Sequence, residues 1–276
     1  MSAQPDSPFP ATPSARSSGD RSQPTWATGA IAPIVLAIVW STGIGGLTYL
    51  LARPFLPPIP QARDATEASD AVVATVLIPG VIHSLIASVS FLIVAILMAW
   101  FSGRHIDRKS GRAASRQRGF IRIGLGDRPL GAPGLLLGAI LLIIVYAVFL
   151  SDLQFRNVDD FFGAVFRAGT GWRLAAFLVF GLLAPVAEEM MFRGWLWTSL
   201  RQSWPGFACT LVTGLLWLLT HASEGPIKIA ILAPVALLLG LMRQQSASLR
   251  APILLHLALN CAGLTAPFVL RALGVA

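Results

Sequence analysis

RLAAFLVFGLLAPVAEEMMFRGWLWTSLR, the stretch from Arg173 to Arg201, is apolar enough to cross a bilayer, yet two adjacent glutamates and an arginine stand in its interior. About 20 helical residues span a hydrocarbon core. A charged side chain at that depth costs roughly 2.5 to 3.5 kcal/mol on insertion scales, so such residues usually face a polar interior and have a function. We therefore predict a membrane helix that brings Glu188, Glu189 and Arg193 into a buried polar site.

The composition of the whole chain favours the same class of protein. Of the 276 residues 55% are hydrophobic and only 12% are charged, whereas soluble domains carry about 25% charged residues. Apolar runs without Lys, Arg, Asp or Glu recur between Arg21 and Arg53, Asp70 and Arg104, Arg128 and Asp152, Arg201 and Glu224, Lys228 and Arg243, and Arg250 and Arg271. We expect an all-α polytopic membrane helical bundle of about seven transmembrane helices, the sixth of them short, with no separate water-soluble domain.

The segments outside these runs predict the topology. Residues 1–25 are rich in Ser and Pro and are expected to form a disordered tail rather than a cleaved signal peptide, whereas residues 26–276 form an integral membrane domain. The segment Ser102–Arg128 is strongly basic, and Lys and Arg accumulate in cytoplasmic loops. This places the N-terminus in the cytoplasm and the loops Arg53–Asp70 and Asp152–Arg167 outside, in a bacterial plasma membrane.

The net charge of +8 comes mostly from that basic loop. Only one phenylalanine, Phe120, stands among the basic residues, and the flanking segments are long enough to span a bilayer, so topology and anionic lipid explain the charge. We expect no nucleic-acid partner.

The spacing of Glu188 and Glu189 from Arg193 predicts different roles for the two acids. Glu189 lies four residues before Arg193, which allows the two to pair on one helix face, whereas Glu188 points about 100° away. We expect Glu189 and Arg193 to form a structural pair and Glu188 to face a substrate or water. A desolvated carboxylate can accept a proton from water and return it to a leaving amine. In the alternative reading, both acids only bind Arg193 and hold helices together.

Two histidines stand in later apolar runs. His221 follows Trp217 by four residues, so the two rings share a face, and the turn at Pro205 lets this helix pair with the one that carries Glu188. His221 alone would equally suit a helix end, bonded to a carbonyl. His256 precedes Asn260 by four residues, and the pair could donate hydrogen bonds to an oxyanion. The alternative for Asn260 is a bond between helices.

The three groups together resemble a known family. Glu188-Glu189-Met190-Met191-Phe192-Arg193, Trp217-Leu218-Leu219-Thr220-His221 and His256-Leu257-Ala258-Leu259-Asn260 are similar to the Glu-Glu-x-x-x-Arg, Phe-x-x-x-His and His-x-x-x-Asn motifs of the intramembrane CAAX-protease and bacteriocin-processing family, which includes the abortive-infection proteins. The approach to the third motif, with Arg243, Ser248 and Pro252, is also similar. The one departure is Trp217, where the family usually has Phe, and it affects pocket shape more than chemistry.

The resemblance implies an intramembrane endopeptidase of the type II CAAX prenyl endopeptidase kind, with a protease-like core at 172–273. Glu188 and His221 would activate a water, His256 and Asn260 would stabilise the oxyanion, and Glu189, Arg193 and Trp217 would support them. The substrate would be a membrane-associated peptide or protein, prenylated or bacteriocin-like. Zinc bound by Glu188, His221 and His256 is left open, because two imidazoles and a carboxylate also form catalytic zinc sites.

Two further readings keep the same helices. One is a catalytically silent scaffold or immunity protein that binds a peptide or a membrane protein partner. The other is a transporter with a proton relay, which inverted repeats and broken helices would support, and the sequence contains neither.

Overall fold

The structure is a computed structural model that describes residues 33–40, 43, 77–110, 140, 143 and 161–274. Every element between residues 77 and 274 in these ranges is helical, which confirms the all-α class. In chain order the elements are α3 (Ile78–Ser110), α6 (Phe161–Arg167), α7 (Thr170–Ala176), η3 (Phe177–Leu183), α8 (Ala184–Glu189), η4 (Met190–Leu196), α9 (Trp197–Leu200), α10 (Gly206–Leu219), η5 (Ala222–Glu224), α11 (Pro226–Ser246) and α12 (Arg250–Ala272).

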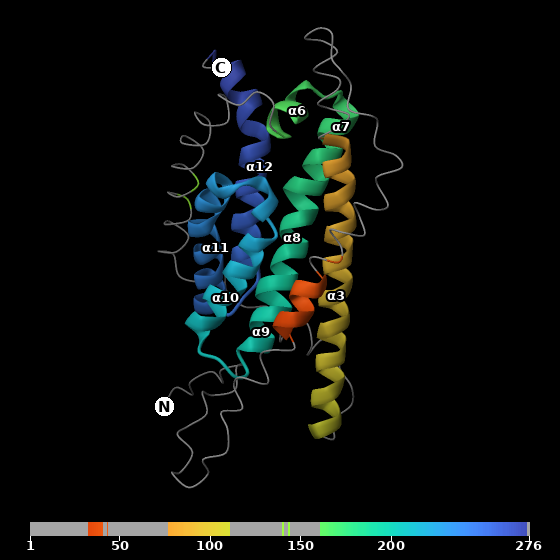
Figure 1. The fold of residues 1–276 in the computed structure, drawn as a ribbon, viewed down its shortest axis with the longest axis vertical. Helices are drawn as coiled ribbons and strands as arrows, with labels where there is room; N and C mark the ends of the chain where they lie inside the picture. Colours follow the sequence, from red (N-terminus) through yellow and green to blue (C-terminus); the bar gives the residue numbers. More distant parts are fainter. Residues whose placement is uncertain are drawn as a thin grey trace, which may run out of the picture.

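One continuous helix, Thr170–Leu200, runs through the middle of the bundle and is called the central helix below. It comprises α7, η3, α8, η4 and α9, of which η3 and η4 are wider, π-helical stretches. α3 packs along one side of it, and α12 packs against η3 and α8 on another (Figure 1). α10 and α11 pack closely together, and α11 also contacts α12. The first two motifs therefore lie on neighbouring helices, with the third on α12.

Among the residues that the structure describes, three helices are long and apolar enough to cross a membrane: Ile78–Met98, Thr170–Leu200 and Lys228–Ser246. The predicted sixth helix is longer than expected, because α11 has 21 residues and Arg243 lies inside it, not at its end. α3 continues to Ser110, so the start of the predicted basic loop is helical. The predicted first and third membrane helices, the N-terminal tail and the two outside loops lie wholly or largely outside the described residues.

The polarity of the bundle is the reverse of that of a soluble protein. Leu215 and Leu219 on α10 are 59% and 56% exposed, while the charged residues Glu189 and Arg193 are 0% exposed. Apolar side chains on the outside and paired charges within suit a hydrocarbon surrounding, where water cannot solvate polar groups. These are the features of an integral membrane protein.

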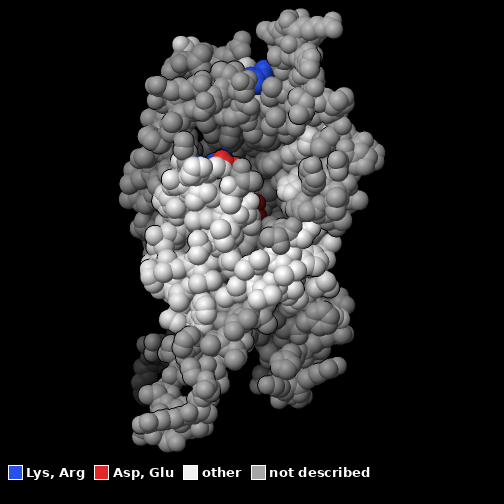
Figure 2. Space-filling model, viewed as in Figure 1, with Lys and Arg blue, Asp and Glu red and all other residues white. Residues whose placement is uncertain are grey.

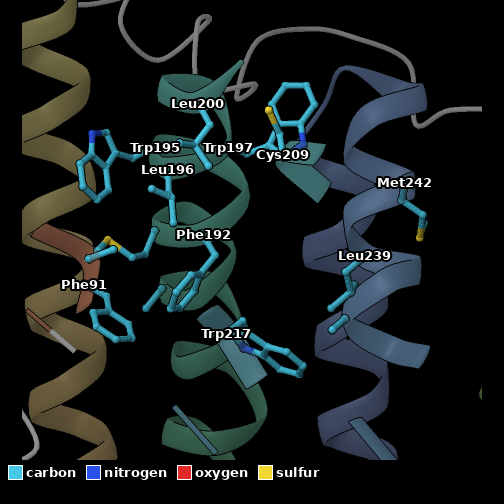
Figure 3. Packing of buried hydrophobic residues seen from close by; sticks show 14 of the residues in the cluster. Phe91, Phe192, Trp195, Leu196, Trp197, Leu200, Cys209, Trp217, Leu239 and Met242 are labelled. Carbon is cyan, nitrogen blue, oxygen red and sulfur yellow. The ribbon is translucent and has the colours of Figure 1, made fainter. Parts of the chain in front are cut away.

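Aromatic side chains fill the centre of the bundle (Figure 3). Phe91 of α3 meets Phe192 of η4 edge to face, with ring centroids 5.8 Å apart. Trp197 and Trp217 are each 1% exposed, and both lie in the same buried cluster as Leu239 of α11. Large rings bury much surface and lose few torsional degrees of freedom, so this cluster holds the polar residues beside it in fixed positions.

Pro185 accounts for the wider helical stretch η3, and side chains of α12 bind the backbone oxygens that this proline leaves free. Pro185 has no N–H to offer to the carbonyls one turn earlier, and its ring disfavours regular α-helical geometry there. Side chains of α12 bind two of these carbonyls: Asn260 Nδ2 donates to the Phe180 oxygen at 2.8 Å, and the Cys261 thiol lies 3.6 Å from the Gly181 oxygen. Neighbouring helices often satisfy backbone groups freed in this way inside membranes.

The contact between α10 and α11 depends on a glycine. A Cβ atom at Gly240 would lie 2.6 Å from Cγ2 of Thr210, whose hydroxyl is 3.2 Å from the Gly240 carbonyl oxygen. We expect Gly240→Ala to lower the free energy of unfolding by about 1–3 kcal/mol, because overpacking outweighs the gain in helix propensity. Adding Thr210→Ser, which removes Cγ2 and keeps the hydroxyl, should restore most of the loss in a denaturant titration in detergent. An unchanged Gly240→Ala protein would contradict the close packing.

Candidate active site

The centre of the site is a buried cluster of three ionisable side chains. Arg193 donates from Nη1 to Oε1 of Glu189 at 2.9 Å, and both side chains are 0% exposed. His256 Nδ1 lies 3.0 Å from the same oxygen. The pairing of Glu189 with Arg193 that the four-residue spacing indicates is therefore present, and α12 brings His256 to it. A carboxylate at Nδ1 fixes the orientation of the imidazole ring and favours the tautomer with its proton on that nitrogen.

Backbone carbonyls and a second arginine hold Arg193 in place. Arg193 Nη2 donates to the Ala236 oxygen of α11 at 3.2 Å. Arg243, also in α11, donates from Nε to the Arg193 oxygen at 2.9 Å and from Nη2 to Thr198 Oγ1 at 3.3 Å, and its side chain is fully buried. Planar guanidinium groups suit such fixed multiple contacts. The positions of these two arginines are thereby coupled, and α11 is attached to the central helix.

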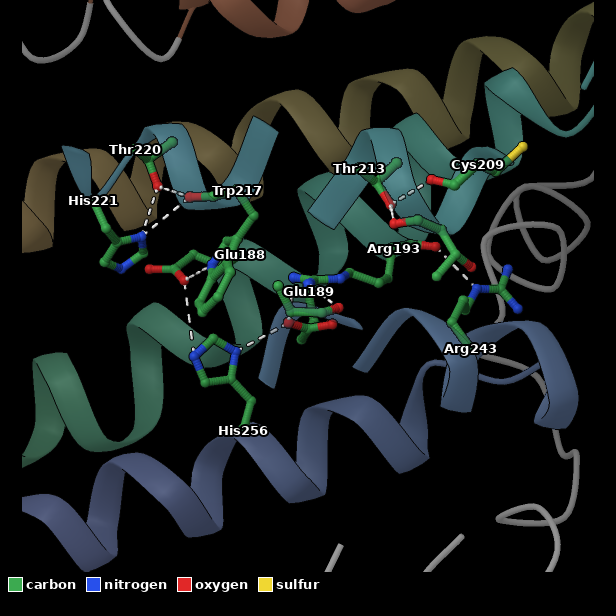
Figure 4. Close-up of polar contacts among 12 residues, drawn as sticks. Glu188, Glu189, Arg193, Cys209, Thr213, Trp217, Thr220, His221, Arg243 and His256 are labelled. Carbon is green, nitrogen blue, oxygen red and sulfur yellow. Dashed lines mark hydrogen bonds and ion pairs between the residues drawn. The ribbon is translucent and has the colours of Figure 1, made fainter. Parts of the chain in front are cut away.

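Glu188 lies on the other side of this cluster. Its Oε2 accepts a hydrogen bond from Trp217 Nε1 at 2.5 Å and is 3.9 Å from His256 Nε2. The Glu188 side chain is 19% exposed, in contrast to the fully buried Glu189. Figure 4 shows its carboxylate between the imidazole rings of His221 and His256. The two adjacent acids thus have different surroundings, as their angular separation on the helix implies.

His221 lies just beyond the end of α10. Its Nδ1 is 3.1 Å from the Trp217 carbonyl oxygen, the contact that the helix-end reading predicts, and 3.1 Å from Thr220 Oγ1. Its Nε2 lies 3.9 Å from Glu224, and its ring centroid is 4.7 Å from that of Trp217. With Nδ1 directed at a carbonyl, Nε2 is the nitrogen that can accept a proton. A helix-end contact and a role at the site are therefore compatible.

The structure brings Glu188, His221 and His256 around one side chain, Trp217. The His256 ring meets the Trp217 ring edge to face with centroids 5.4 Å apart. Asn260 is placed differently: it lies one turn further along α12, with its Nδ2 on the Phe180 carbonyl. This is the bond between helices that the alternative reading of Asn260 predicts, and it occupies one of the two amide hydrogens.

The two adjacent acids differ in how far they can be reached from outside. In Figure 2, acidic atoms are visible at the edge of a hollow, beside atoms of a basic residue, and further back in a narrow gap. Because Glu189 is fully buried and Glu188 is not, Glu188 is the member of the acidic pair that water or a substrate can reach.

The three candidate zinc ligands, Glu188, His221 and His256, all have other partners in the structure. Within the described part of the chain, no group of three or more His, Cys, Asp or Glu side chains has an arrangement that could hold a metal ion. His221 Nδ1 faces a backbone carbonyl, His256 Nδ1 faces Glu189, and Glu188 Oε2 accepts the indole N–H. The Nδ1 contacts of the two histidines leave both Nε2 atoms available, as in known zinc sites, so the misfit lies in the relative placement of the three side chains and not in these hydrogen bonds.

Three contacts of the site could not be read from the motifs. They are the indole N–H of Trp217 on Glu188, and the carbonyl oxygens of Ala236 and Phe180 as acceptors. Backbone acceptors leave no mark on a sequence, because every residue carries one. The Trp217 contact had a weak signal, since the residue was the one departure from the family pattern and indole is a hydrogen-bond donor.

A family model matches residues 170–262, about a third of the chain and the part that carries all three motifs. Its description, type II CAAX prenyl endopeptidase Rce1-like, indicates a CAAX-type protease that acts on a peptide or protein. Searches of curated proteins and of solved structures found no significant match. The resemblance that the three motifs indicated is confirmed: over residues 170–262 the chain is similar to the type II CAAX prenyl endopeptidase Rce1-like family.

Proposed function

We propose that the protein is an intramembrane endopeptidase that hydrolyses a peptide bond in a membrane-associated peptide or protein, prenylated or bacteriocin-like, with a water activated by Glu188 and His221. The observation that carries the proposal is the contrast within the acidic pair. Glu189 is buried and neutralised by Arg193, whereas Glu188 is partly exposed between two imidazoles. One acid is thus available for proton transfer while the other maintains the site.

The chemistry follows from these positions. Glu188 takes a proton from water as the water oxygen attacks the scissile carbonyl carbon, and His221 Nε2 accepts a hydrogen bond from the same water. The Glu188 carboxyl then gives its proton to the departing amine as the C–N bond breaks. His256 and Asn260 would stabilise the oxyanion, His256 through its Nε2 side and Asn260 with its second amide hydrogen.

We further propose that residues 26–276 form the membrane domain with the protease-like core at 172–273, and that residues 1–25 form a tail. The basic segment Ser102–Arg128 supports an N-terminus in the cytoplasm, and we propose a bacterial plasma membrane as the location. The partners are then the lipid bilayer and the substrate.

The test is hydrolysis by the purified protein in detergent. The native protein is incubated with a library of quenched peptides, half of them prenylated, in water enriched in ¹⁸O. We expect cleaved products with one ¹⁸O atom in the new carboxyl group, read by mass spectrometry, because the attacking oxygen comes from solvent. Cleavage should persist after exhaustive chelation. Loss of cleavage on chelation and recovery with added zinc would contradict the metal-free chemistry.

The scaffold reading predicts a different result. A protein that only captures peptides would bind members of the library with no cleavage of any of them. Binding is read by fluorescence anisotropy on the same peptides without the quencher. Binding without ¹⁸O incorporation would overturn the proposal of an enzyme.

A further inference from the structure

We propose that Trp217 is a positioning residue of the reaction: its indole N–H holds Oε2 of Glu188, so that Oε1 is the oxygen that receives the proton of the attacking water. The proposal rests on the proposed function. It goes beyond that function by giving the two carboxylate oxygens different tasks and by naming the group that separates them.

The hydrogen bond between Trp217 and Glu188 is the first support. The Nε1 to Oε2 distance is 2.5 Å, and the tryptophan is 1% exposed. An indole N–H can only donate, so Oε2 must accept. Hydrogen bonds from a neutral donor to an ionised oxygen are shorter and stronger than those between neutral groups. Among the described residues no hydrogen bond reaches Oε1, and the side chain keeps 19% of its surface exposed. Oε1 is therefore the oxygen that can meet a water.

The second support is that Trp217 contacts three further ionisable groups of the site. Its ring centroid lies 5.1 Å from Arg193 Cζ, 5.4 Å from the His256 centroid and 4.7 Å from the His221 centroid. Its carbonyl oxygen also lies 3.1 Å from His221 Nδ1. One rigid ring with two side-chain torsions thus sets the spacing between Glu188 and the two imidazoles. Such positioning contributes to rate because reacting groups must be held near their attack geometry.

The N–H can be removed without removing the ring. Trp217→Phe leaves an aromatic ring but no donor, and β-(3-benzothienyl)alanine at position 217 keeps the bicyclic shape with sulfur in place of N–H. We expect both variants to lower kcat by roughly ten- to a hundred-fold, the equivalent of one hydrogen bond to a charged group, and to change KM much less. A drop in kcat with constant KM is the sign of a contact needed in the transition state.

Trp197 supplies a matched control. It is also 1% exposed and in the same cluster, but its indole N–H points to the hydroxyl of Thr210 at 3.4 Å. Trp197→Phe should leave kcat within about three-fold of native, because this bond does not reach a reacting group. If Trp217→Phe and the benzothienyl variant stay within that same range, the positioning role is overturned.

A spectroscopic arm does not depend on activity. The chain contains eight tryptophans, so ¹⁵N-indole labelling gives a small set of N–H resonances, and the one missing from the Trp217→Phe protein identifies Trp217. We expect this resonance to move when Glu188→Gln replaces the charged acceptor with a neutral one, while the Trp197 resonance stays in place. An unmoved Trp217 resonance would refute the contact.

If the native protein hydrolyses no peptide, the proposed function fails and the positioning role fails with it. The Trp217 resonance would still decide whether Trp217 binds Glu188.

Discussion

Glu188→Gln is expected to reduce kcat by roughly 10²- to 10⁴-fold, the usual contribution of a general base, while the folded structure persists. Glutamine has the same shape and its amide oxygen can still accept the Trp217 N–H, but it cannot take a proton from water. Glu188→Ala, which also removes the acceptor, should be at least as inactive. Initial rates on a quenched peptide identified with the native protein measure the effect.

Glu224 provides the comparison for Glu188. Its side chain is 46% exposed and lies 3.9 Å from His221 Nε2. Its Oε2 also lies 3.6 Å from Lys228 Nζ. An exposed ion pair of this kind is worth under about 1 kcal/mol, so Glu224→Gln should reduce the rate by no more than about five-fold. Retention of native kcat by Glu188→Gln would remove Glu188 from the chemistry and favour the scaffold reading.

Arg193→Met is expected to lower the free energy of unfolding by roughly 3–5 kcal/mol, the largest stability change that we predict. The substitution leaves the buried carboxylate of Glu189 without its guanidinium, and also removes the donor to the Ala236 carbonyl. Methionine fills a similar volume, so the loss reports on charge and hydrogen bonding rather than on a cavity. Titration of the purified protein with a denaturing detergent, followed by circular dichroism, measures it.

Two companions make this measurement specific. The double variant Glu189→Gln with Arg193→Met removes both charges and should recover roughly half of the loss, because a neutral amide is less costly to bury than a lone carboxylate. Arg173→Met changes an exposed arginine of the same helix that contacts the rings of Phe166 and Phe268, and should cost no more than about 1 kcal/mol. Equal losses for Arg193→Met and Arg173→Met would contradict the buried pair.

The sequence predicted the helical class because apolar runs of bilayer length are unmistakable, and it predicted the pair Glu189–Arg193 because four-residue spacing on a helix fixes geometry locally. It gave the wrong length for the sixth helix. Arg243 was taken as a boundary, yet it is buried inside α11, bonded to the Arg193 carbonyl. A charged residue can lie inside a membrane helix when another helix supplies a hydrogen-bond partner for it. Such partners depend on the tertiary fold, which local sequence patterns do not predict.

The hydrogen-bond partners of His256 and Asn260 also could not be predicted from their spacing along the helix. The histidine and asparagine of the third motif share one face of α12, but His256 binds Glu189 and Asn260 binds the Phe180 carbonyl. Both contacts depend on how α12 crosses the central helix at the widened turn. The roles of Glu188, His221, His256 and Asn260 in catalysis accordingly stay predictions that the experiments above decide.

The attachment of α12 at the widened turn has a consequence for how such a chain can vary. Asn260 binds the backbone oxygen of Phe180 and not its side chain. Replacement of this phenylalanine by another apolar residue would therefore keep the hydrogen bond. Pro185, five residues after Phe180, has no N–H to bind this oxygen, and the Asn260 amide binds it instead. Pro185 and Asn260 thus help to set the alignment of the two helices, and with it the depth at which His256 meets the acids, while the apolar residue at position 180 can vary.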